Sequence, residues 1–230
     1  MEKGHYVYDY PRPMVATDCV IFGFDGAKIQ VLLVKRAESP YPGSWGLPGG
    51  FIRMDESAEA SAKRVLQSKT GMADTYIEQF HTFSSPDRDV RGRVISIAFY
   101  ALVRKQEVRE GGNVVSADWF SMDELPDLCF DHKEVLDMAL VKLRERIMFR
   151  PVGFDLLPEK FTMRELQSLY ESILGVEFDR RNFSKKILHI GLLDDLNETI
   201  KANPKREAKL YKFNLENYDR LKEKGFRLEF

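Results

Sequence analysis

The order of hydrophobic and polar positions in the first half of the chain predicts alternating strands and helices. A nearly continuous apolar run with β-branched residues, Ala16–Phe24, is typical of a buried strand. The pair Asp25–Gly26 favours a hairpin turn because glycine accepts a positive φ, and the alternating segment Lys28–Arg36 would return as a second strand. Further strands are expected at residues 75–83, 93–103 and 116–120, with a turn at residues 111–112.

Other segments of this half favour helices or loops. Ser57–Thr70 repeats its apolar positions at the helical period and is followed by Gly71, a typical helix C-cap. A second helix is expected at His132–Arg146. Prolines and glycines predict a loop over residues 37–50. Helices placed between strands indicate an α/β fold, in which the layers pack as a sandwich.

The two parts of the chain follow different patterns, which predicts two domains. Pro151 and Gly153 disfavour a continued helix after the first part. We therefore expect an α/β sandwich domain of residues 1–150 and a smaller domain of residues 151–230. A chain of 230 residues is long enough for both.

The smaller domain begins with clear helix signals. Thr162 and Glu165 form a capping box, in which each side chain satisfies a backbone amide of the other, ahead of an amphipathic helix that ends at Gly175. After three residues, Asp179 can cap a basic helix, Arg180–Ile190, which gives a helix-turn-helix pattern. Residues 192–200 and 208–213 would pair as strands, and residues 201–206 between them would form the basic wing of a winged helix-turn-helix.

Charge and composition narrow the classes of function. The net charge of −1 gives the whole chain no general affinity for nucleic acid, but residues 180–212 hold nine lysines and arginines against four acids. No apolar run reaches the roughly 18 residues of a membrane span, and the N-terminus does not resemble a signal peptide. Cys19 and Cys129 match no metal-ligand spacing, and together these features predict a reducing, cytoplasmic location.

A glycine-rich loop followed by a helix carries the chemistry of the first domain. Gly50, Glu56, Arg64 and Gly71 stand at a spacing that resembles the Nudix box, and the lead-in Trp45–Gly50 is also similar to that family. In Nudix hydrolases, glutamates three and four residues apart on the helix hold Mg²⁺ against a pyrophosphate. The resemblance implies a Nudix-like fold with a cleft for a phosphorylated ligand.

The sequence departs from the Nudix box where the metal would bind. The three acid positions are occupied by Val65, Ser68 and Lys69, and Glu56 alone is retained. One carboxylate cannot assemble a divalent-metal site, and Lys69 places a cation where the metal would be. We therefore expect no catalytic residue, no metal and no cofactor. An alternative role for Glu56 and Arg64 is an internal ion pair that preserves the fold.

A cleft without a metal site is suited to binding without turnover. Arginine can hold phosphate or carboxylate through two hydrogen bonds, aspartate can accept the hydroxyls of a sugar, and tryptophan can stack. For the Asp-Arg-Asp run at residues 87–89, the alternative is a solvated turn with local ion pairs. The candidate effector-binding residues are Trp45, Arg53, Glu56, Arg64, Asp87, Arg88, Asp89 and Arg91.

The basic helix Arg180–Ile190 is the predicted interface with double-stranded DNA. At about 100° per residue, Phe183, Ile187 and Ile190 share the buried face. Arg181 and Lys185 lie near the opposite pole, where a helix in the major groove can read guanine edges. The alternative is a solvated basic face. The candidate DNA-binding residues are Arg181 and Lys185 for bases, Arg180, Lys186, Lys205 and Arg206 for phosphates, and the flanking Asn182 and Ser184.

The combination of the two predicted domains resembles the Nudix-related transcriptional regulators, the NrtR group and its arabinose-responsive AraR relatives. The run Asp-Arg-Arg-Asn-Phe at residues 179–183 is typical of that group. The likeness implies a dimeric repressor of a palindromic operator, controlled by a sugar or an ADP-ribose-like effector. Residues 87–93 resemble the loop of both branches and do not choose between them. The alternatives are a divergent metal-dependent Nudix hydrolase of nucleoside diphosphate derivatives, and a module that binds an acidic protein.

Overall fold

The fold is taken from a computed structural model, which describes residues 8–71, 76–105, 114–151, 153–203 and 206–225. The chain divides into two compact units, Met1–Gly23 with Gln30–Ala139, and Phe24–Ile29 with Leu140–Phe230. The predicted domain boundary at residue 150 stays a prediction, and the turn predicted at residues 111–112 lies outside the described residues. Among the described residues, no helix has the length and apolar character of a membrane span.

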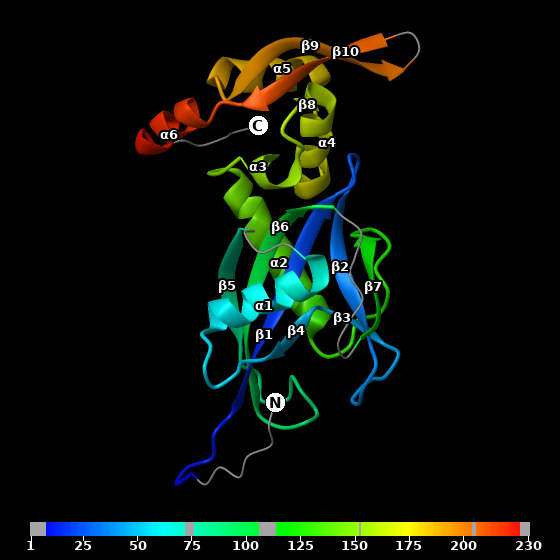
Figure 1. Cartoon of the computed structure of the whole chain (residues 1–230), viewed down its shortest axis with the longest axis vertical. Helices are drawn as coiled ribbons and strands as arrows, with labels where there is room; N and C mark the ends of the chain where they lie inside the picture. The colour runs from blue at the N-terminus through cyan, green and yellow to red at the C-terminus, as the bar shows by residue number, and fades with distance from the viewer. Residues whose placement is uncertain (1–7, 72–75, 106–113, 152, 204–205, 226–230) are drawn as a thin grey trace. The chain divides into compact units, whose positions relative to one another are not determined.

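The first unit is built on one sheet of seven described strands (Figure 1). They are β1 (Met14–Phe24), β2 (Ile29–Arg36), β3 (Trp45–Gly46), β4 (Gly49–Phe51), β5 (Ile77–Phe83), β6 (Val94–Arg104) and β7 (Val114–Ser121). The main path runs β3-β2-β1-β6-β5, while β4 pairs with β1 and β7 pairs with β2. The five predicted strands are confirmed. The loop expected over residues 37–50 is wrong in part, because β3 and the start of β4 form there through pairing with distant strands.

Helices cover both faces of this sheet because its central strand is apolar on both faces. Cys19 and Ile21 of β1 pack with buried residues of α1 (Ala58–Thr70) in one cluster. Val20 points to the opposite face of the strand and is equally buried. That face is covered by the start of α2 (His132–Ile147), which lies behind the sheet in Figure 1. The site described below therefore rests on a rigid α/β framework.

The ends of α1 follow directly from the local sequence. Ser57 accepts a hydrogen bond from the Ala60 backbone N–H at 3.1 Å, which caps the first turn. Gly71 ends the helix with a φ of 75° and donates its N–H to Gln67 O. The predicted helix and its glycine cap are confirmed.

The second unit combines short helices with a three-stranded sheet. Its elements are α3 (Gly153–Leu156), β8 (Phe161–Thr162), α4 (Met163–Leu174), α5 (Arg180–Ile190), β9 (Leu193–Asn203), β10 (Arg206–Phe213) and α6 (Leu215–Glu223). The sheet order is β8-β10-β9, with antiparallel pairing throughout. In Figure 1, α5 lies along the long β9–β10 hairpin. This is the predicted winged helix-turn-helix arrangement.

Capping fixes the two central helices of this unit as the sequence predicts. Thr162 and Glu165 form the reciprocal capping box of α4, with the Thr162 N–H donating to Glu165 Oε2 at 2.7 Å. Gly175 ends α4 at a φ of 70°. Asp179 then accepts a hydrogen bond from the Asn182 N–H at 2.9 Å, so that α5 begins at residue 180.

Two details of the second unit differ from the sequence prediction. The proposed wing loop, residues 201–206, is shorter, because β9 extends to Asn203 and pairs it with Arg206. The expected break in the helix near Pro151 and Gly153 is present, since α2 ends at Ile147 and the separate helix α3 begins at Gly153. Helix α6 was not predicted, although its N-cap, Asn214, accepts the Asn217 N–H at 2.8 Å.

Candidate functional site

A cavity of about 580 Å³ opens in the first unit between α1, β4 and the loop after β5. Its volume lies in the ordinary range of small-molecule pockets, roughly 300–1,000 Å³. The cavity is lined by the glycine-rich turn at residues 47–51, by one face of α1, and by side chains of residues 88–91. The fold of the first unit therefore brings the predicted box and the predicted charged loop to one place.

Glu56 and Arg64 form the internal ion pair that the sequence suggested. Arg64 Nε donates to Glu56 Oε2 at 2.9 Å, and its Nη2 donates to the other carboxylate oxygen. The Arg53 backbone N–H adds a further hydrogen bond at 2.9 Å. These donors, Arg64 first, lower the pKa of Glu56 from 4.5 to about 2. Arg64 lines the cavity, and Glu56 holds its guanidinium in place.

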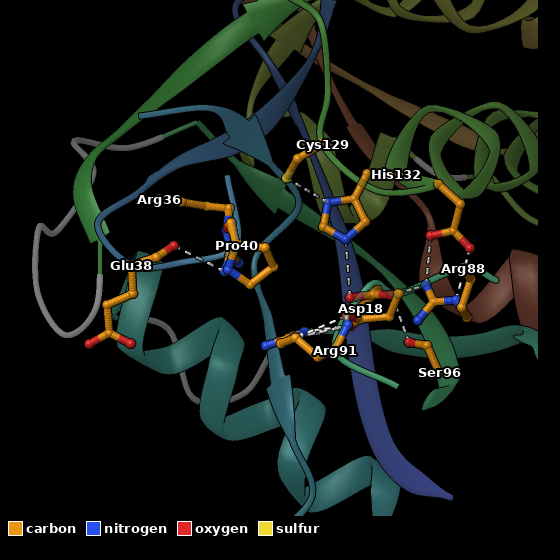
Figure 2. Close-up of polar contacts among 11 residues, drawn as sticks. Asp18, Arg36, Glu38, Pro40, Arg88, Arg91, Ser96, Cys129 and His132 are labelled. Carbon is orange, nitrogen blue, oxygen red and sulfur yellow. Dashed lines mark hydrogen bonds and ion pairs between the residues drawn. The ribbon is translucent and has the colours of Figure 1, made fainter. Parts of the chain in front are cut away.

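Arg88 is the centre of a buried charge network beneath the cavity. Its guanidinium donates to Asp18 at 2.9 Å and to both oxygens of Asp131, at 2.7 and 2.8 Å. Ser96 donates to the same Asp18 oxygen at 2.7 Å. Figure 2 shows these side chains converging from separate segments. A solvated turn is therefore wrong for Arg88, whose side chain is only 4% exposed.

His132 connects this network to the glycine-rich turn. Its Nδ1 accepts the Leu47 backbone N–H at 2.9 Å, so its Nε2 carries the hydrogen and faces Asp18 Oδ1 at 3.6 Å (Figure 2). Burial lowers the pKa of His132, and the nearby aspartates oppose this shift only in part. A neutral imidazole at the first residue of α2 thus holds one wall of the cavity.

Asp89 and Arg91 form a local ion pair, as the alternative for this run predicted. Asp89 accepts two side-chain hydrogen bonds from Arg91, at 2.9 and 2.6 Å, and its own side chain is 3% exposed. The Arg91 guanidinium lies over Phe51 and Phe130, at 5.0 and 5.4 Å from the ring centroids. Arg91 therefore presents a fixed cation to the cavity.

Four predicted contacts do not line the cavity. Trp45 packs edge-on against Phe120 at 4.7 Å, and the Arg53 side chain is exposed. Asp87 is also exposed and borders a neighbouring hollow of about 490 Å³. The fourth, Glu56, is connected to the cavity only through Arg64.

The face of α1 that enters the cavity carries no carboxylate. Val65, Ser68 and Lys69 line the cavity at the positions where the Nudix box has acids. Lys69 is only 9% exposed, and burial lowers the pKa of its ammonium group. Within the described residues, no group of three or more His, Cys, Asp or Glu side chains is placed to hold a metal ion. Residues of this kind do not fit Mg²⁺.

Sequence reasoning missed several residues of the site. Asp18 was the one detectable signal, since a carboxylate inside an otherwise apolar strand needs a buried partner. Arg36 at the end of β2 and Phe130 also line the cavity, but neither stands in a recognisable pattern. The sequence around Asp131 and His132 predicted only the beginning of a helix. Their roles follow from contacts with segments 43 to 85 residues away in sequence.

The exposed face of α5 is the second candidate site. Phe183 and Ile187 are buried, as the helical period predicts, whereas Ile190 is only half-buried. Arg181 and Lys185 are exposed, and within the described part of the chain neither has a carboxylate partner. The exposed residues also include Arg180, Asn182 and Lys186, while Ser184 is half-buried. Lys205 lies outside the described residues, and Arg206 is placed only as the first residue of β10.

Part of the basic surplus near the wing is neutralised within the unit. Lys209 pairs with Asp195 at 2.6 Å, and Lys212 lies 3.9 Å from Asp194. These surface pairs contribute little stability, but each offsets a positive charge on the hairpin. Among the described residues, the exposed Arg181 and Lys185 of α5 have no such carboxylate partner.

Known proteins with the same arrangement cover nearly the whole chain. Family models match residues 12–139 as a NUDIX domain and residues 153–213 as an NrtR DNA-binding winged helix domain. An ADPR responsive transcriptional repressor NtrR of Acinetobacter baylyi is 32% identical over 219 residues, which is 92% of this chain and 86% of the relative.

Solved structures agree with this similarity. Shewanella oneidensis NrtR in complex with a 27mer DNA has a TM-score of 0.74 and 31% identity, covering 93% of this chain and 97% of that one. The NUDIX domain of the same Shewanella oneidensis protein, in complex with ADP ribose, has a TM-score of 0.54 and 33% identity, covering 59% of this chain and 94% of that one.

Proposed function

The chain belongs to the family of Nudix-related regulators in which a Nudix domain precedes an NrtR DNA-binding winged helix domain, and we propose that it is a repressor controlled by an ADP-ribose-like effector. It is a DNA-binding transcriptional regulator. The observation that carries the proposal is that the similarity to an ADPR responsive repressor spans both units, 92% of the chain.

The charge of the cavity favours a phosphorylated effector over a neutral sugar. Arg36, Arg64, Lys69 and Arg91 all line it, and a cation gains most from a ligand that carries phosphate. Arg88 and Asp89 also line the cavity. Glu56 acts on the ligand only through Arg64. We assign the effector site to this cavity and leave Trp45, Arg53 and Asp87 outside its lining.

We assign DNA binding to the exposed face of α5 and to the wing. Arg181 and Lys185 would contact base edges, with Asn182 and Ser184 beside them. Arg180, Lys186, Lys205 and Arg206 would contact phosphates. Two copies of the chain in a homodimer would place two such helices on the half-sites of a palindromic operator. This function belongs in the cytoplasm, as the cysteine usage predicts.

Titration of labelled upstream DNA tests the proposal. The full-length protein should bind a duplex from its own upstream region with nanomolar to tens-of-nanomolar affinity, and ADP-ribose should shift that affinity. A scrambled duplex should bind at least about 10³-fold more weakly. Binding that shows no sequence preference, or that ADP-ribose, arabinose and other sugars all leave unchanged, would rule out an effector-controlled regulator.

The competing function is a divergent Nudix pyrophosphohydrolase, because residues 12–139 match the NUDIX domain. We propose that hydrolysis is lost, since Val65, Ser68 and Lys69 offer no metal ligand and Glu56 is bound by Arg64. Incubation of ADP-ribose with Mg²⁺ or Mn²⁺ should yield no AMP above background. Turnover that Glu56→Gln abolishes would instead establish the enzyme.

A further inference from the structure

The fold family implies Mg²⁺ in the cavity, and the residues present do not fit that ion. In Nudix hydrolases the metal neutralises the charge of the bound pyrophosphate. Here the corresponding face of α1 presents Val65, Ser68 and Lys69 to the cavity. The Ser68 hydroxyl donates to Val65 O at 2.7 Å, within its own helix turn. A different group must therefore neutralise a diphosphate bound at this place.

The carboxylates around the cavity are already committed to arginines. Asp18, Glu56 and Asp89 each accept a hydrogen bond from an arginine at 2.9 Å or less. Glu38 also lines the cavity, but it is exposed, and in Figure 2 its carboxylate points away from the charged cluster. Recruiting Glu56 or Asp89 to a cation would leave an arginine without its carboxylate, and recruiting Asp18 would remove one of the two carboxylates that bind Arg88.

Arg36 is a cation that the protein orients without neutralising it. Its Nε donates to Pro40 O at 2.8 Å and its Nη2 donates to Glu38 O at 3.4 Å (Figure 2). The guanidinium also lies over the Phe130 ring, 5.0 Å from the centroid. Carbonyl oxygens and an aromatic ring hold its direction but carry no full negative charge. Among the described residues, Arg36 has no carboxylate partner.

Lys69 lies at the position of a box glutamate and is buried in the cavity wall. A diphosphate bound in the cavity would interact favourably with this ammonium group. Lys69 lines the cavity from α1 and Arg36 lines it from the end of β2, so both cations border the space that one ligand would occupy.

We propose that Arg36 and Lys69 neutralise the diphosphate of the effector, so that the ligand binds in this cavity without a divalent metal ion. This inference rests on the proposed ADP-ribose-like effector and specifies how that site recognises it. Replacement of the metal-binding acids then does more than remove catalysis, because it also changes which groups bind the diphosphate. The position of a metal-binding acid in an enzyme becomes the position of a ligand-binding cation in a regulator.

Calorimetric titration of the full-length protein with ADP-ribose, in EDTA and in excess Mg²⁺, tests the metal independence. The two dissociation constants should agree within about threefold. Binding that is lost or weakened on the order of tenfold in EDTA would overturn the inference and leave the proposed effector intact. Absence of ADP-ribose binding under both conditions would instead contradict the proposed function.

Variants then test the two cations directly. Lys69→Gln and Arg36→Gln should each weaken ADP-ribose binding about tenfold or more in EDTA. The matched control is Lys63→Gln, which removes the same charge from an exposed position on α1 and should bind like the wild type. Lys69→Arg should restore most of the affinity, because it keeps the charge.

Salt dependence separates a charge effect from a change of shape. Added NaCl screens charge, so wild-type affinity should fall more steeply with NaCl than that of Lys69→Gln. A Lys69→Gln or Arg36→Gln protein with unchanged affinity would contradict the proposal. Equal salt slopes for wild type and both variants would do the same, because the lost affinity would then come from altered packing.

Discussion

Two arginines in similar local sequences have opposite environments. Arg88 follows an aspartate in the run Asp-Arg-Asp, and Arg181 lies in the run Asp-Arg-Arg-Asn. Arg88 is 4% exposed and binds two carboxylates from distant segments. Arg181 is exposed and, in the described part of the chain, has no carboxylate partner. Burial requires an internal partner for a charge, whereas an exposed cation is available for a partner outside the protein.

The same difference separates the two sites as wholes. In the cavity of the first unit, Arg64, Arg88 and Arg91 are each held by a carboxylate, which fixes the wall that a ligand meets. On α5, Phe183 and Ile187 are buried and the cations face solvent. The first arrangement suits recognition of one small molecule by a rigid pocket. The second suits the long, uniformly charged surface of DNA.

Removal of Arg88 should give the largest effect. Arg88→Ala leaves the buried Asp18 and the half-buried Asp131 without their cation, which should destabilise the first unit by about 3–5 kcal/mol. Urea unfolding followed by tryptophan fluorescence measures this unit alone, because Trp45 and Trp119 both lie in it. The exposed control Arg181→Ala should stay within about 0.5 kcal/mol of the wild type. Similar losses of unfolding free energy from both variants would contradict the difference between a buried, paired arginine and an exposed one.

Removal of Arg181 should act on DNA instead of on stability. Arg181→Ala should weaken binding of the specific duplex by about 1–3 kcal/mol and relax its base preference. Lys205→Ala, which removes a proposed phosphate contact, should weaken all duplexes alike and reduce the salt slope by about one. Fluorescence anisotropy with specific and scrambled duplexes at several salt concentrations measures both. Equal losses of specificity would contradict the division into base and phosphate contacts.

The sequence predicted those features that depend on residues close together in the chain, and it missed those that depend on residues far apart in the chain. The C-cap at Gly71, the capping box at Thr162 and the glycine at residue 175 depend on neighbours within a few residues, and all three were predicted correctly. The partners of Arg88 lie 43 and 70 residues away in sequence, so no local pattern could identify them. The strands β3 and β4 were missed for the same reason, since each is defined by pairing with a distant strand.

Loss of the Asp89 charge tests whether burial or pairing governs the cavity. Asp89→Asn keeps one acceptor for Arg91, whose side chain is 37% exposed and can be solvated. The cost should therefore be about 1 kcal/mol, well below that of Arg88→Ala. The control Asp87→Asn, at an exposed position of the same loop, should change stability by less than about 0.5 kcal/mol. A loss as large as that of Arg88→Ala would mean that pairing matters regardless of burial.

The smallest effect is expected for the acid stability that Glu56 contributes. Hydrogen bonds from Arg64 lower the pKa of the folded carboxyl from 4.5 to about 2. A lowered folded pKa stabilises the protein fully above pH 4.5, and this contribution is lost as the pH falls toward about 2. Urea unfolding at a series of pH values should show a shallower acid decline for Glu56→Gln than for the wild type. Arg64→Gln should flatten the curve in the same window, because it breaks the same pair from the other side. Parallel curves for all three proteins would show that this pair, unlike the Arg88 network, contributes nothing to stability.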